Sequence, residues 1–131
     1  MKNKYLFILI ALIVIVLDQL TKYLVKALNI PYIKNTGAGF GILQGQTLML
    51  IFASIFAVGI ILYYHDKAFK SRLTTVAASL ILGGTLSNLI DRIYYRHVID
   101  FINLKIWPSF NIADTAISIG ALLLVYYFWK K

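Results

Sequence analysis

The sequence predicts an all-α membrane protein with four transmembrane helices. Of its 131 residues, 60% are hydrophobic and 14% are charged, whereas soluble domains are about 45–50% apolar and about 25% charged. Four apolar segments each come close to the roughly 20 residues that a spanning helix needs. In lipid the backbone must satisfy its own hydrogen bonds, so these segments are expected to be helices. The length fits a single integral membrane domain over residues 1–131.

The first predicted helix carries Asp18, Lys22 and Lys26, and the second has no charge. Because no small-residue cleavage site follows its apolar core, the first segment is expected to be a helix rather than a removed signal peptide. The four predicted helices cover residues 4–27, 47–64, 73–92 and 112–129.

Basic residues in three short segments predict the topology. With four crossings these segments share one side, and the positive-inside tendency makes that side cytoplasmic. We therefore expect a multi-pass protein of the cell (inner, cytoplasmic) membrane with both termini in the cytoplasm. The net charge of +8 is then explained by basic flanks at the lipid surface, and no nucleic-acid partner is expected. The segments carry Lys2 and Lys4, then Lys67, Lys70 and Arg72, then Lys130 and Lys131.

The two longer connections lie on the opposite, extracytoplasmic side. Residues 28–46 are rich in glycine, and their apolar residues are expected to form short strands around a turn at residues 35–39. Residues 93–110 are too apolar for a free loop, so we expect a short amphipathic helix at the membrane interface. The expected strand residues are Tyr32, Ile33, Phe40 and Ile42.

The polar residues of the apolar segments and of the two outer connections are predicted to converge at the outer end of the bundle. An α-helix rises about 1.5 Å per residue, so Asp18 lies about 21 Å from Lys4 and Asp114 about 24 Å from Lys130. Charges at such depth are costly and face the bundle interior or a wet cavity. The residues predicted to converge are Asp18, Asn35, Asn88, Asp91, Asp100, Asn111 and Asp114.

Asp100 and Asp114 are the candidate catalytic pair. Two carboxylates within hydrogen-bond reach share a proton, so one acts as base on a water and the other as acid to a scissile carbonyl. The dipole at the start of the last helix favours the charged form of Asp114, so Asp100 is expected to hold the proton. Asp91 is the rival for one role. Without cysteine, and with only two isolated histidines, no metal or other cofactor is expected.

Several of these residues also have structural alternatives. Asp18 and Lys22, four residues apart, can form a helix-end ion pair without chemistry. Asn111 can be an ordinary N-cap, with Asp114 favoured by the helix dipole. The carboxylates can also form a proton path, so a small proton-coupled membrane transporter, with Asp18, Asp91 and Asp114 as its relay, is the alternative function.

Gly83 and Gly84 are expected to serve close helix packing. Arg92 is expected to pair with a carboxylate or a substrate carbonyl, with a lipid headgroup as the alternative. His65 and His97 are expected to be interfacial side chains.

Five sequence blocks, in register across nearly the whole chain, together resemble the lipoprotein signal peptidases, also called signal peptidase II. The blocks are DQLTK at 18–22, NTGAGF at 35–40, GG at 83–84 followed by NLIDR at 88–92, VIDFI at 98–102 and FNIAD at 110–114.

This resemblance implies a four-helix aspartyl endopeptidase that removes the signal peptide from diacylglyceryl-modified prolipoproteins, cutting before the lipidated cysteine. It implies a catalytic pair at Asp100 and Asp114 near the extracytoplasmic face, a small β cradle and an interfacial helix. Implied partners are lipid-modified prolipoproteins, membrane lipids and globomycin-type inhibitors. The implied supporting residues are Asp18, Lys22, Asn35, Asn88, Asp91, Arg92 and Asn111.

Three positions depart from the family pattern. Gly39 stands where alanine is usual, Ser87 where glycine is usual, and Asn103 replaces a common aspartate. They touch neighbouring positions and not the pair itself, so they bear on substrate preference more than on activity. A catalytically inactive, lipopeptide-binding homologue is a further alternative.

Overall fold

The computed structural model describes residues 2–64 and 70–131. His65 and Lys67, which the sequence analysis named, lie outside the described residues. In chain order the elements are α1 (Lys2–Ala27), β1 (Ile33–Asn35), the 3-10 helix η1 (Gly39–Gly41), α2 (Thr47–Tyr63), α4 (Arg72–Tyr95), β2 (Val98–Asp100) and α5 (Ile112–Trp129).

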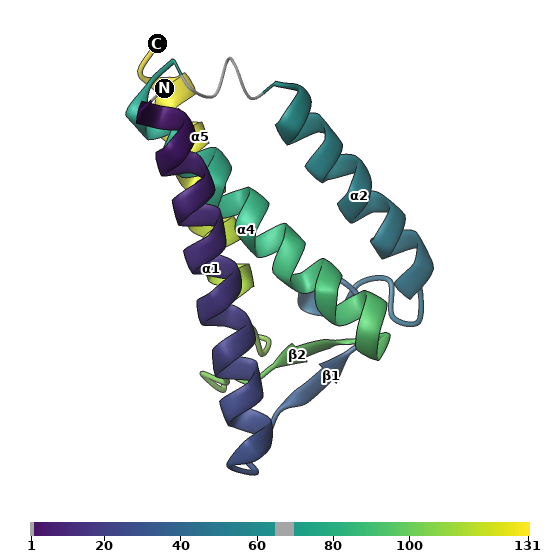
Figure 1. Cartoon of the computed structure of the whole chain (residues 1–131). Coiled ribbons are helices and arrows are strands. Elements are labelled where there is room, and N and C mark those ends of the chain that lie inside the picture. The colour runs from purple at the N-terminus through teal and green to yellow at the C-terminus, as the bar shows by residue number, and fades with distance from the viewer. Residues whose placement is uncertain (1, 65–69) are drawn as a thin grey trace.

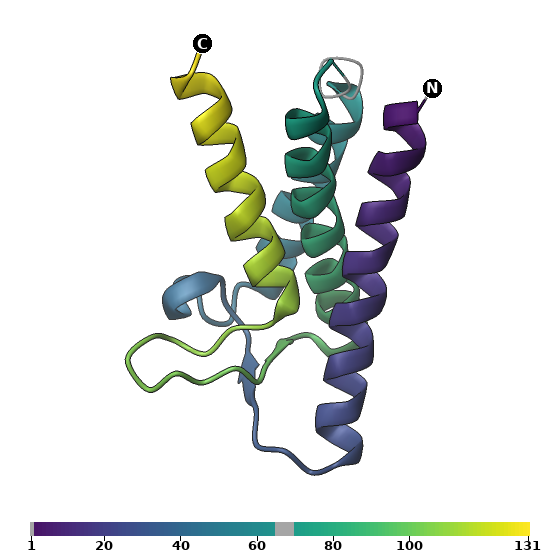
Figure 2. The same ribbon diagram turned by 90° about the vertical axis from the view of Figure 1, so that its left-hand side faces the viewer.

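The helix α4 is the centre of the bundle. It packs against α1, α5 and α2, and α2 leans away from the other helices toward the end where the termini lie (Figure 1). Figure 2 shows α5, α4 and α1 side by side, with a long loop reaching out before α5. The two-stranded sheet lies at the end of the bundle opposite both termini (Figure 1). Both longer connections therefore meet at one end.

Three of the described helices are long and apolar enough to cross a membrane, namely α1, α4 and α5. The helix α2 is apolar and uncharged, but it has 17 residues and is shorter than the others. The chain is thus a multi-pass membrane protein with a largely helical fold. The predicted count of four spanning helices is not confirmed, and the fourth crossing stays a prediction.

Local sequence signals fix the helix ends. The helix α1 ends in a Schellman motif, in which the Ile30 amide donates to the Val25 carbonyl at 2.9 Å and Asn29 takes a left-handed conformation with φ of 53°. Ser71 is the N-cap of α4, and its hydroxyl accepts from the Thr74 amide at 3.1 Å. After the last residue of α4, Tyr95, the C-cap Arg96 takes a left-handed conformation with φ of 62°. These ends set where the site-bearing loops begin.

Glycines bring the helices into close contact, as the sequence predicted. A Cβ atom added at Gly83 would lie 2.7 Å from the Ala11 carbonyl oxygen of α1, and one at Gly84 would lie 2.5 Å from the Ala113 carbonyl oxygen of α5. The helix α4 therefore touches the backbones of both neighbours, which is the small-residue packing typical of membrane helices.

The prediction for the first connection is wrong in its pairing. Strand β1 pairs with β2 of the other connection, antiparallel, with Ile33 opposite Asp100 and Asn35 opposite Val98. The segment expected to return as a second strand forms η1 instead, and the Ala38 amide closes a turn onto the Ile42 carbonyl at 2.7 Å. Glycines are poor strand formers, so this segment turns, and β1 takes its partner from the neighbouring loop.

The interfacial helix expected within residues 93–110 is not confirmed either. Beyond Tyr95, where α4 ends, the described residues of this connection form β2 and an isolated antiparallel bridge between Ile102 and Phe110. The Lys105 amide donates to the Asn103 side chain at 2.8 Å, a local turn that competes with helix. Pro108 further breaks any helix because it lacks an amide hydrogen.

We predict that Gly84→Ala destabilises the protein by about 1–3 kcal/mol, because the new methyl group overpacks the contact with α5. Gly59→Ala in α2 is the matched control, since a Cβ atom there meets nothing within 4 Å. It should leave stability unchanged or raise it by up to about 1 kcal/mol through helix propensity. Unfolding of the detergent-solubilised variants tests this, and equal stabilities for the two would contradict the packing argument.

Candidate active site

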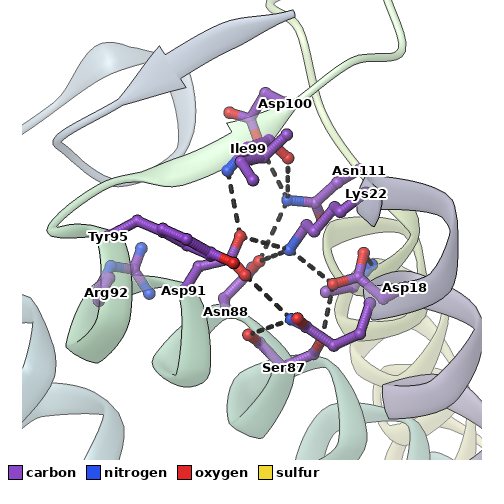
Figure 3. Close-up of polar contacts among 12 residues, drawn as sticks. Asp18, Lys22, Ser87, Asn88, Asp91, Arg92, Tyr95, Ile99, Asp100 and Asn111 are labelled. Atoms are coloured by element: carbon purple, nitrogen blue, oxygen red, sulfur yellow. Dashed lines mark hydrogen bonds and ion pairs between the residues drawn. The ribbon is translucent and has the colours of Figure 1, made fainter. Parts of the chain in front are cut away.

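A buried lysine joins α1 to α4 through two carboxylates. Lys22 is 1% exposed, and Asp18 and Asp91 are fully buried. The Lys22 Nζ lies 2.6 Å from Asp18 Oδ2 and 2.8 Å from Asp91 Oδ2, and it donates to Asn88 Oδ1 at 3.2 Å (Figure 3). An ammonium has three hydrogens, so three acceptors satisfy it. The ion pair of Asp18 and Lys22 is therefore present and extends to a second helix.

Two residues that the sequence analysis did not assign to the site complete this cluster. The Gln19 Nε2 donates to Asp91 Oδ1 at 2.9 Å and to Ser87 Oγ at 3.0 Å. The Ser87 hydroxyl donates to Asp18 Oδ2 at 2.6 Å. Ser87 precedes Asp91 by four residues, so helical spacing places both on one face of α4. This spacing was the signal in the sequence that could have assigned Ser87 to the cluster. A glycine at position 87 would lack this hydroxyl.

The start of α5 is fixed from two directions. Asn111 is its N-cap, and the capping box is reciprocal, because the Asp114 amide donates to Asn111 Oδ1 at 2.8 Å and the Asn111 amide donates to Asp114 Oδ2 at 3.2 Å. The next free amide, that of Ala113, donates to Asp18 Oδ1 at 2.8 Å. A carboxylate at a helix N-terminus is favourable, so Asp18 docks α5 against α1. The predicted N-cap is confirmed.

Two asparagine amides connect the charged cluster to the acidic pair. The Asn111 Nδ2 donates to Asp100 Oδ1 at 2.9 Å and to Asn88 Oδ1 at 3.1 Å. The Asn88 Nδ2 donates to Asp114 Oδ1 at 2.9 Å. Asp100 and Asp114 thus each accept a hydrogen bond from an asparagine amide, and the other hydrogen bonds of that asparagine fix the orientation of the amide. The two carboxyl groups are linked through Asn111, which contacts both.

Asp100 and Asp114 open onto one cavity of about 670 Å³. Burial raises the pKa of Asp100 to about 7, and the charge of Asp114 adds to the rise. Hydrogen bonds from Asn35 and Asn111 and the charge of Lys22 oppose it. The pKa of Asp100 thus lies near neutral pH, and the division of roles within the pair stays a prediction.

The remaining predicted residues lie at the edge of this arrangement. The Asn35 Nδ2 donates to Asp100 Oδ2 at 3.0 Å. Arg92 lines the cavity, and its Nη2 donates to the Gly37 carbonyl at 3.3 Å. His97 lies against the ring of Tyr95, with centroids 6.0 Å apart.

All the predicted site residues come together at the end of the bundle that carries the sheet. Nothing lies within 4 Å of a Cβ atom added at Gly39, so an alanine there fits. Both this residue and Asn103 are exposed.

The cavity has a polar end and apolar walls. Its polar end is lined by the two aspartates with Asn35, Asn88 and Arg92. The rest of its wall includes small and aliphatic residues of three helices. Those wall residues are Leu50, Ala53, Ser54 and Ala57 of α2, Thr85 of α4, and Ile117, Ser118, Ile119 and Leu122 of α5. The site can therefore hold an apolar, membrane-embedded ligand with one polar segment at the aspartates.

Comparison with known proteins agrees with this architecture. The family model described as signal peptidase (SPase) II matches residues 10–130. A lipoprotein signal peptidase of Halothermothrix orenii is 38% identical, with 94% of each chain covered. One of Syntrophus aciditrophicus is 44% identical, with 95% of this chain and 92% of the relative covered. A bacterial membrane enzyme solved by the in meso method at 2.3 Å resolution matches with a TM-score of 0.85 and 31% identity, covering 95% of this chain and 87% of that one.

We predict that Lys22→Met destabilises the protein by about 3–5 kcal/mol, because it leaves Asp18 and Asp91 as buried charges without a cation. Lys26→Met, one turn along α1, is the matched control. Lys26 donates to the Tyr95 hydroxyl in an exposed contact, so its loss should cost about 1 kcal/mol or less. Unfolding in detergent measures both, and a Lys22→Met protein as stable as the control would refute the role of the cluster.

Proposed function

The chain belongs to the signal peptidase II family, and from this premise we propose that it is an aspartic endopeptidase whose catalytic pair is Asp100 and Asp114. It removes the signal peptide from prolipoproteins. One observation carries the assignment of the pair: both carboxyl groups line one cavity and both contact Asn111.

Asp91 is the weaker candidate for either role. Its two carboxylate oxygens are engaged by Lys22, by the Gln19 amide and by the Ile99 backbone amide at 3.1 Å. Asp91 is also fully buried, and it is not among the residues that line the cavity. Asp100, by contrast, has a raised pKa and faces the cavity, as expected of an acid–base group.

In the proposed mechanism, ionised Asp114 takes a proton from water while the water oxygen attacks the scissile carbonyl carbon. Protonated Asp100 gives its proton to the carbonyl oxygen, so a tetrahedral diol forms. When the diol collapses, Asp100 takes back a hydroxyl proton, the C–N bond breaks, and Asp114 protonates the leaving amine. Both groups thereby return to their starting states.

The surrounding residues are proposed to orient these two groups and the substrate. Asn88 and Asn35 each donate to one carboxyl group of the pair, at 2.9 and 3.0 Å, and so hold it against rotation. Arg92 lines the cavity and has five donors, of which one goes to Gly37. We propose that others bind a backbone carbonyl of the substrate. Asp18, Lys22, Asp91 and Asn111 are proposed to hold α5, which carries Asp114, and β2, which carries Asp100.

We further propose that the substrates carry a diacylglyceryl-modified cysteine and that cleavage falls before it. The apolar cavity walls suit acyl chains and an apolar signal segment, and they suit membrane lipids and globomycin-type inhibitors as further ligands. We propose that α2 is the fourth crossing, that both termini are cytoplasmic, and that the site lies near the extracytoplasmic face of the cell membrane. The common end of the termini, opposite the sheet, supports this topology (Figure 1). The comparisons do not favour the proton-coupled transporter.

We predict that Asp100→Asn and Asp114→Asn each lower cleavage of a lipidated precursor by at least about 10³-fold, because an amide neither takes nor gives the required proton. Asp66→Asn is the control, since this aspartate belongs to the basic connection that the sequence predicts on the cytoplasmic side; it lies outside the described residues. Gel-shift assays with membranes that contain equal amounts of each variant measure the effect. Substantial turnover by either active-site variant would refute the pair.

We predict that cleavage declines as the pH rises above about 7, because Asp100 then loses the proton that it must donate. Below this pKa the pair holds one proton and is competent. Above it, kcat/KM should fall about tenfold per pH unit, as for loss of one proton. A profile of kcat/KM from about pH 5 to about pH 9 tests this, and a rate that stays constant up to the alkaline end would contradict the assigned acid.

A further inference from the structure

The amide of Asn35 can serve Asp100 in one orientation only. Its Nδ2 donates to Asp100 Oδ2 at 3.0 Å and to the Ala38 carbonyl at 3.3 Å. Its Oδ1 accepts from the Gly37 amide at 2.9 Å. If the amide turned over, its oxygen would face the Asp100 carboxylate, which favours the protonated carboxyl group and disfavours the charged one.

Gln44 provides a second donor that fixes this orientation. Its Nε2 donates to Asn35 Oδ1 at 3.2 Å, and its Oε1 accepts from the Thr36 hydroxyl at 2.6 Å. The Thr36 hydroxyl in turn accepts from the Gly45 amide at 3.2 Å. Both ends of the Gln44 amide are thus assigned, although the residue itself lies on the exposed face of the loop.

The glycines of the loop leave room for this side chain. A Cβ atom at Gly37 would lie 3.0 Å from Gln44 Nε2 and would also collide with the Ile42 carbonyl oxygen. A Cβ atom at Gly41 would lie 3.4 Å from the same nitrogen. The glycine-rich stretch lets the Gln44 amide fold back over it and reach Asn35. The close contacts explain the glycine at position 37, whereas the φ of 70° explains the glycine at position 41.

We propose that Gln44 is a positioning residue for the reaction, which fixes the Asn35 amide so that it donates to Asp100. The inference rests on the proposed role of Asp100 as the catalytic acid. Gln44 does not line the cavity and touches neither carboxyl group, so it acts through Asn35. Its effect falls on the protonation of Asp100.

The direction of the effect follows from the donor. The Asn35 hydrogen bond lowers the pKa of Asp100 and so opposes the rise that burial causes. Loss of Gln44 weakens this bond, so the pKa of Asp100 rises further. The charged groups that face Asp100 are Asp114 of α5, Lys22 of α1 and Arg92 of α4. Lys34 of β1 is exposed and alternates with Asn35, so it points to the other face of the strand.

The test is the pH profile of kcat/KM for Gln44→Leu and Gln44→Glu. Leucine removes both amide contacts. Glutamate keeps the shape and the acceptor for Thr36 but has no hydrogen for Asn35, so it is the variant that preserves the loop. We expect the alkaline limb to move up by about half to one pH unit in Gln44→Leu. It should move further in Gln44→Glu, whose charge also disfavours ionisation of Asp100.

The matched controls are Gln46→Leu and Gln46→Glu, two residues along the same loop. The Gln46 side chain is exposed and makes no capping bond to α2, so both controls should keep the wild-type limb. Unshifted limbs in both Gln44 variants, or rates lowered equally at every pH, would overturn the positioning role. Normal turnover by Asp100→Asn would instead refute the proposed function, so the two failures are distinguishable.

Discussion

The site depends on one buried cation. Lys22 sits where α1, α4 and the first turn of α5 meet, and its three hydrogens go to Asp18, Asp91 and Asn88. Each of these acceptors then directs a further group: Asp18 the start of α5, Asp91 the backbone of β2, and Asn88 the carboxyl group of Asp114. A charged ammonium away from water is costly unless fully paired. The three contacts that pair the Lys22 ammonium therefore also order the start of α5, the backbone of β2 and the carboxyl group of Asp114.

Much of this site could be predicted from the sequence, because lipid allows few places for charge. In a chain with five acidic residues, each aspartate at the end of an apolar segment must find a partner. Helical spacing placed Asp18 with Lys22, and Asn88 with Asp91 and Arg92, on common faces. Because successive helices cross the membrane in opposite directions, these residues were predicted to lie at one end of the bundle. Such arguments need only periodicity and length, which are local properties of the chain.

Long-range pairing and loop form could not be predicted in the same way. The sequence of Ile33–Asn35 does not indicate that this strand pairs with Val98–Asp100, since short strands carry little information about register. The apolar content of residues 93–110 suggested a helix, but the turn at Asn103 and the break at Pro108 produce an extended loop. Gln19 and Ser87 were missed because neutral polar side chains have many possible partners, and the structure alone shows which carboxylate each one contacts.

The contacts of both carboxyl groups depend on the N-cap of α5. Asn111 reaches Asp100 with the same amide group that caps the helix bearing Asp114, and Asp18 reaches the next backbone amide. Until that first turn is wound and seated, neither acid has its neighbour. In a newly inserted chain, the two carboxyl groups therefore lack these shared contacts until α5 has docked onto α1.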